Sequence, residues 1–153
     1  VFIGEVHVLP KIFGSVHVPT EVLAELGRSK SPHLEAVRRW ASSPPDWLYV
    51  QEPKKVDEHL LQRLDLGEAQ AIALAQELDA ERVLLDEKQG RKVAKERGLH
   101  VAGTLAILEE AAVRDYLDIE KAVGQLRDSN YRASEKLYRL TIENVRVRKL
   151  APE

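Results

Sequence analysis

Acidic side chains beside apolar runs are the residues of this chain whose type and spacing suggest chemistry. Asp86 and Glu87 directly follow the apolar run 83–85, while Glu68 lies near the start of a helical segment and Glu25 lies on another. In open parallel sheets, ligands bind beyond the carboxyl ends of the strands. Carboxylate oxygens are suitable ligands for a hard divalent cation such as Mg²⁺. Hard-metal chemistry is therefore the candidate.

Each acid also has an ordinary structural interpretation. Asp86-Glu87 is suited to begin the next helix as an N-cap, and Asp65-x-x-Glu68 is close to a capping box. Glu21 and Glu25 are four residues apart, which is also the spacing of a solvated helix face. None of these signals is specific alone, so both interpretations remain open.

Several other chemistries are excluded. The chain has no cysteine, which rules out thiolate zinc sites, disulfides and cysteine catalysis. No phosphate-cradling glycine motif and no serine-nucleophile motif is present. The histidines are scattered without the pairing typical of zinc sites: His7, His17, His33, His59 and His100. Zinc, acyl-transfer and redox chemistry are therefore not supported.

Short apolar runs alternate with amphipathic segments along most of the chain. Strands are predicted at 15–18, 47–50, 82–85 and 99–102. Helices are predicted after Thr20, Ser31-Pro32, Asp65, Glu87 and Thr104, and then at 119–128 and 133–145. This alternation predicts an α/β fold with a parallel sheet flanked by helices, followed by a helical C-terminal extension.

The first segment and the domain count complete the organisation. Val1–Ile3 is suited to a strand remnant, but Val6, Leu9, Ile12 and Phe13 are equally suited to the inner face of a short helix, against which Pro10 argues. The length of 153 residues, without repeats or a long linker, predicts a single domain over 1–153. Apolar runs of about five residues are far too short to span a membrane.

Charge is unevenly distributed around a net value of −2. Residues 126–153 hold seven basic and four acidic residues, and a second basic cluster follows Asp86 at Lys88, Arg91, Lys92, Lys95 and Arg97. This second cluster is either a solvated helix face or a basic rim that contacts nucleic-acid phosphates. The absence of cysteine fits a cytoplasmic location.

Several short motifs occur together in this chain. They are Gly67-Glu68 with Ala71-Ile72, Leu85-Asp86-Glu87, Gly90-Arg91 with Ala94, Gly103-Thr104, the upstream segment 12–26 and the closing segment 126–140. Together they resemble the PIN-domain family, which comprises small metal-dependent ribonuclease-like proteins and includes VapC-type toxins, and the resemblance covers about residues 3–140. It implies a PIN-like, flavodoxin-like parallel sheet and an acidic site for Mg²⁺ or Mn²⁺.

Residues of that site follow from the same resemblance. Glu25, Glu68 and Asp86 fall on the family's acidic positions as catalytic and metal-binding residues, and Glu87 is an alternative or additional ligand. Arg91 is the candidate for a phosphate contact, with Lys88 and Lys92 as weaker ones. Equally, Arg91 is suited to pack on the sheet edge and pair with an acid.

One element of the family pattern has no match. PIN proteins begin with a central strand that ends in an aspartate, and the match here starts after that point. Either this strand precedes Val1 or the chain is a truncated, inactive relative. We expect the former, because loss of a central strand exposes unpaired backbone on both neighbours.

Three functions are compatible with the sequence. The first is a divalent-metal-dependent endoribonuclease that cleaves RNA, for which the resemblance implies a toxin role with an antitoxin partner and a homodimer. The second is an inactive PIN-like module that binds nucleic acid or protein, suggested by the absent first acid and the basic tail. A phosphoryl-accepting regulator with an acidic pocket ranks third.

Overall fold

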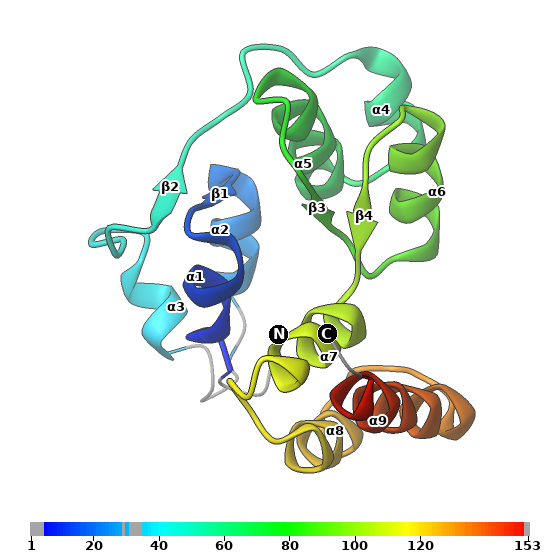
Figure 1. The fold of residues 1–153 in the computed structure, drawn as a ribbon. Coiled ribbons are helices and arrows are strands. Elements are labelled where there is room, and N and C mark those ends of the chain that lie inside the picture. Colours follow the sequence, from blue (N-terminus) through cyan, green and yellow to red (C-terminus); the bar gives the residue numbers. More distant parts are fainter. Residues whose placement is uncertain (1–4, 29, 31–34, 152–153) are drawn as a thin grey trace. The chain divides into compact units, whose positions relative to one another are not determined.

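The computed structural model describes residues 5–28, 30 and 35–151 as a mixed α/β chain (Figure 1). Its strands are β1 (Val16–Val18), β2 (Leu48–Val50), β3 (Val83–Leu84) and β4 (Val101–Ala102). Its helices are α1 (Val8–Phe13), α2 (Thr20–Arg28), α3 (Glu35–Arg39), α4 (Glu58–Arg63), α5 (Leu66–Glu77), α6 (Lys88–Glu96), α7 (Thr104–Val113), α8 (Ile119–Arg127) and α9 (Glu135–Leu150). The predicted α/β class with a helical C-terminal part is confirmed.

The strands pair in parallel, as the alternation predicts. Val16 of β1 lies opposite Leu48 of β2, and Val83 of β3 lies opposite Val101 of β4. Among the described residues, however, these pairs are two separate two-stranded sheets rather than one. Each pair is joined by its own helical crossover, which is the connection that parallel strands require.

Helix ends follow the capping chemistry of the sequence. Asp65 accepts a hydrogen bond from the Glu68 amide at 2.9 Å and begins α5. Gly98 follows α6 with a φ of 76°, a conformation that glycine adopts without a steric penalty. The predicted cap at Ser31-Pro32 and the strand remnant at Val1–Ile3 lie outside the described residues.

The contacts divide the chain into two compact units, 15–103 and 1–14 with 104–153. We call them the central unit and the terminal unit and describe each by itself. The single-domain prediction stays a prediction. Within the described ranges, no helix combines the length and apolar character needed to cross a membrane.

The central unit has a core of small and β-branched side chains. Ala69 and Ile72 of α5 and Val93 and Ala94 of α6 are fully buried, together with Leu60 of α4. Small side chains allow close approach of helix backbones, and α5 contacts α2, α4, α6 and β3. Helix α5 is therefore the element around which the acidic residues are arranged.

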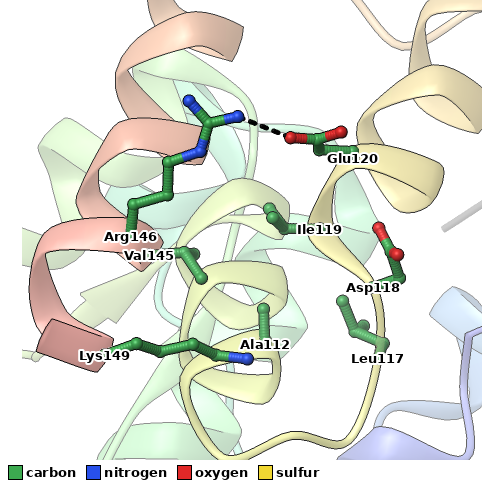
Figure 2. A pocket seen from close by; sticks show the side chains of 8 residues that line it. All are labelled: Ala112, Leu117, Asp118, Ile119, Glu120, Val145, Arg146 and Lys149. Atoms are coloured by element: carbon green, nitrogen blue, oxygen red, sulfur yellow. Dashed lines mark hydrogen bonds and ion pairs between the residues drawn. The ribbon is translucent and has the colours of Figure 1, made fainter.

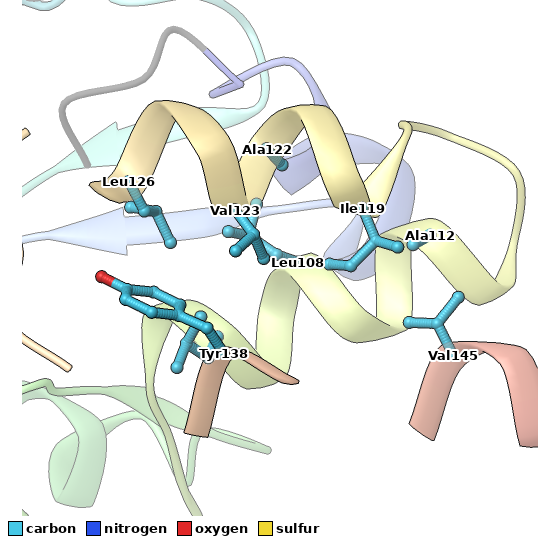
Figure 3. Packing of buried hydrophobic residues seen from close by; sticks show 9 residues of the cluster. Leu108, Ala112, Ile119, Ala122, Val123, Leu126, Tyr138 and Val145 are labelled. Carbon is cyan, nitrogen blue, oxygen red and sulfur yellow. The ribbon is translucent and has the colours of Figure 1, made fainter. Parts of the chain in front are cut away.

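The terminal unit is a helical cluster. Leu108 of α7, Val123 and Leu126 of α8, and Tyr138 and Val145 of α9 are buried against one another (Figure 3). These side chains recur at helical spacing on each element, so every helix presents one apolar face to the cluster.

The ambiguous first segment forms a helix that belongs to the terminal unit. Val8 of α1 is buried, α1 contacts α7, and the Lys11 ammonium lies 5.3 Å from the centre of the Tyr116 ring. Pro10 is the third residue of α1. An amide there has no intrahelical partner, so proline is tolerated.

Candidate acidic site

The predicted acids lie on three segments of the central unit. Glu25 is on α2, Glu68 is in the first turn of α5, and Asp86 and Glu87 connect β3 to α6. Helix α5 contacts α2, β3 and α6. The packing of α5 therefore brings Glu25 and Glu87 close enough to Glu68 to interact with it electrostatically. Asp86 is not among the acids that raise the pKa of Glu68.

Two of the carboxylates lie directly against glycine backbone. A Cβ atom placed on Gly67 would be 3.0 Å from Glu25 Oε1, and one on Gly90 would be 2.5 Å from Glu68 Oε1. Glu25 thus reaches the residue that precedes Glu68, and Glu68 in turn reaches the start of α6. The side chains form a connected series from α2 to α6.

Glu68 has the most perturbed environment of these acids. Its Oε1 is buried and has no hydrogen-bond partner among the described residues. Burial, and then the negative charges of Asp65, Glu87 and Glu25, raise the pKa of Glu68 from 4.5 to about 7. Perturbation by burial and by specific like charges is typical of functional carboxylates.

Glu25 belongs to the same electrostatic cluster although its side chain is exposed. Burial, followed by the charges of Asp65 and Glu21, raises the pKa of Glu25, and the Arg28 guanidinium opposes this shift. Arg28 donates a hydrogen bond to Glu21 at 3.0 Å. Glu25 is therefore left with a net repulsion from its neighbours.

The adjacent acids Asp86 and Glu87 have different surroundings. Asp86 Oδ1 lies 3.1 Å from the position of a Cβ on Gly103, where the Arg91 guanidinium also lies. Glu87, rather than Asp86, is among the acids that raise the pKa of Glu68. Glu87 occupies the N-cap position of α6 without a side-chain cap bond. Its side chain is therefore not used as an ordinary helix cap.

The predicted basic residues also differ from one another. Arg91 Nη1 donates to the Leu85 carbonyl at 3.2 Å and packs against Gly103. Lys88 and Lys92 are exposed and one turn apart on α6. Arg91 is thus held at the end of β3, while both lysines face solvent.

We next ask whether these acids could hold a metal ion. In the part of the chain that the structure describes, no three His, Asp or Glu side chains converge as a group that could hold a metal ion. The donor set nevertheless suits a hard cation, because the buried Glu68 oxygen lacks a partner and faces the field of three further carboxylates.

Sequence reasoning missed part of this site. It assigned Asp65 to helix capping, which is correct, but the charge of Asp65 also raises the pKa of both Glu25 and Glu68. It used Gly67, Gly90 and Gly103 only as motif positions. Their packing had no signal in the sequence, because Gly67 faces Glu25 and Gly90 faces Glu68 across different helices.

A separate cavity of about 240 Å³ belongs to the terminal unit (Figure 2). Its apolar lining includes Leu117 and Val145, but the charged groups at its edge are already paired. Arg146 donates to Glu120 at 2.6 Å, and Lys149 donates to Asp115. None of the predicted site residues lines it.

The chain thus combines short parallel strands with carboxylates near the start of α5. Comparison with family models identifies the class: a model described as a PIN domain matches residues 2–146. The chain therefore belongs to the PIN-domain family. Its fold is nuclease-like, and PIN domains generally use divalent metal ions. Comparisons with curated proteins and with solved structures gave no significant match.

Proposed function

We propose that this protein is a divalent-metal-dependent endoribonuclease of the PIN type. The observation that carries this proposal is the environment of Glu68. Its buried Oε1 has no hydrogen-bond partner among the described residues, and burial, followed by the charges of neighbouring carboxylates, raises the pKa of Glu68 to about 7. A cation is the ligand that would neutralise this repulsion.

Glu25, Glu68 and Asp86 are the proposed catalytic acids, and Glu87 is a further metal ligand. These oxygens would hold Mg²⁺ or Mn²⁺, which supplies activation of a water and stabilisation of charge on the scissile phosphate. The burial of Glu68 limits competition from water for its Oε1. Helix α5 holds the backbone of Glu68 through the Asp65 cap.

Binding of RNA is assigned to α6. The guanidinium of Arg91 is pre-positioned by the Leu85 carbonyl and retains further N–H groups for a phosphate. Lys88 and Lys92 on the exposed side of α6 would contribute salt-sensitive attraction to the backbone. The proposed interface therefore lies beside the acids.

The direct test is RNA cleavage by the purified protein with Mn²⁺ or with EDTA. We expect Glu68→Gln and Asp86→Asn each to lower the rate about 100-fold or more, because each removes a proposed ligand. Glu81→Gln is the matched control, since the Glu81 side chain is 84% exposed and outside the site. Unchanged cleavage in both site variants would refute the assignment.

A second candidate is a catalytically inactive module that binds nucleic acid or protein. It is favoured by the absence of a converged group of three metal-binding side chains among the described residues. It predicts salt-sensitive RNA binding without metal-dependent turnover, so cleavage by the purified protein eliminates it. An antitoxin partner, a homodimer and a cytoplasmic location remain proposals drawn from the sequence.

A further inference from the structure

The described glycines divide into two groups according to what surrounds the position of a Cβ atom. Four have no atom within 4 Å: Gly14, Gly27, Gly98 and Gly124. The other three face side chains of the acidic site: Gly67 faces Glu25, Gly90 faces Glu68, and Gly103 faces Arg91 and Asp86. Among the described glycines, those with close neighbours at the Cβ position therefore all face side chains of the candidate acidic site.

Backbone conformation does not require glycine at the two helical positions of this second group. Gly67 lies in α5 and Gly90 lies in α6, and glycine is a poorer helix former than alanine. The positive φ angles among described glycines belong to Gly14 and Gly98. Alanine would therefore be accepted by the backbone at 67 and 90, and the nearest atoms that oppose it belong to the adjacent carboxylates.

We propose that Gly67 and Gly90 are positioning residues, whose missing Cβ atoms set where the carboxylates of Glu25 and Glu68 lie. At position 90 a Cβ would be 2.5 Å from Glu68 Oε1 and 3.0 Å from its Cδ. At position 67 the nearest Glu25 atoms are at 3.0–3.3 Å, so the displacement is smaller. The inference rests on the proposed function only in taking these carboxylates as the cation ligands.

Such a substitution should affect cation binding and folding stability differently. A carboxylate is the far end of a flexible side chain, so an alanine at 90 displaces the Glu68 carboxylate rather than the helix. Displacement exposes an oxygen that is buried without a partner, which does not penalise folding. Gly90→Ala should therefore weaken cation binding without lowering the thermal unfolding temperature.

The experiment combines Mn²⁺ titration by calorimetry with thermal unfolding of the metal-free protein. We expect Gly90→Ala to weaken Mn²⁺ binding about 10–100-fold, the range found when groups that orient metal ligands are changed. Gly67→Ala should have a smaller effect. Gly124→Ala is the matched control in α8, where nothing lies within 4 Å, and should leave binding unchanged.

A compensating variant adds a specific readout. Glu68→Asp shortens the side chain by one methylene and makes room for the new Cβ. Glu68→Asp alone should weaken binding, whereas combined with Gly90→Ala it should recover part of the lost affinity. Such non-additivity is expected for groups in contact and not for distant, independent sites.

Other outcomes separate this inference from the proposed function. Equal Mn²⁺ affinity of the wild type and Gly90→Ala overturns the positioning role and leaves the nuclease proposal intact. Weaker binding with an unfolding temperature several degrees lower also overturns it, since the damage is then general. Absence of binding by the wild type refutes the nuclease proposal alone.

In that case, carboxyl-carbon NMR of the metal-free protein tests the positioning role. A Glu68 resonance that is shifted by Gly90→Ala but not by Gly124→Ala supports this role. A Glu68 resonance that is unchanged by Gly90→Ala overturns it.

Discussion

Helices α5 and α8 begin in the same way, yet their first turns differ. Asp65 caps α5 by accepting from the Glu68 amide at 2.9 Å, and Asp118 caps α8 by accepting from the Lys121 amide at 3.0 Å. The residue at the third helical position is Glu68 in the central unit and exposed Lys121 in the terminal unit. Both helices thus have an aspartate cap, but the side chain at the third helical position is negative in α5 and positive in α8.

The difference separates structure from function. A glutamate at this position normally folds back onto the cap residue and completes a capping box. Glu68 instead lies against Gly90 with Oε1 buried and unpaired among described groups. Polar groups in such a state destabilise the fold, and selection retains them mainly at functional sites. In α8 the residue at the same position, Lys121, is exposed to solvent.

The largest effect that would test this comparison is a pH dependence of stability in EDTA. The fold raises the pKa of Glu68 from 4.5 to about 7, and that of Glu25 in the same direction, so the fold favours their neutral forms. The contribution of these two acids to stability should be greatest below about pH 4.5 and fall until pH passes about 7. Urea unfolding across this range measures the slope.

Glu68→Gln is the variant that isolates this contribution. At pH 8 it should be more stable than the wild type by about 1 kcal/mol, a moderate gain because water reaches part of the side chain and screens the repulsion. At pH 4.5 the two proteins should be equally stable. An unchanged slope in Glu68→Gln would assign the pH dependence to other groups.

A smaller effect is expected from removing the two caps. Asp118→Ala should lower the unfolding free energy by about 1 kcal/mol, the usual cost of losing an N-cap. Asp65→Ala should cost less at pH 8, because losing the cap also relieves the repulsion on Glu68 and Glu25. Equal losses in the two variants would show that the acids near α5 do not interact as described.

The smallest effect comes from giving α8 the charge pattern of α5. Lys121→Glu places a carboxylate at an exposed position in the first turn of α8, where the helix dipole favours it by about 0.3–1 kcal/mol. We expect slight stabilisation without added pH dependence between 4.5 and 7. A new slope of the size seen in the wild type would mean that burial around α5 is not what distinguishes Glu68.

Local patterns in the sequence were sufficient for most elements. The predicted runs 15–18, 47–50, 82–85 and 99–102 each contain a strand, and α6 ends before Gly98 as expected. These features depend on β-branched runs and cap residues within a few positions of one another. The separation into two strand pairs was not predicted, because strand pairing depends on contacts between distant segments.

The details of the acidic site were also not predicted, because they too depend on contacts between distant segments. Resemblance to a family supplied Glu25, Glu68 and Asp86, but it did not indicate that Glu87 is the acid of the 86–87 pair that acts on Glu68. Nor did it indicate that Arg91 bonds the Leu85 carbonyl. Such details arise from the packing of α2, α5 and α6, which no local pattern encodes.

The terminal unit is built from two segments that are far apart in the sequence, which has a consequence for its synthesis. Helix α1 contacts α7, yet about 90 residues separate the two in the chain. At translation rates of roughly 5–20 residues per second, the surface that covers Val8 is synthesised several seconds after α1. The segment between α1 and α7 is therefore synthesised before these two helices can pack against each other.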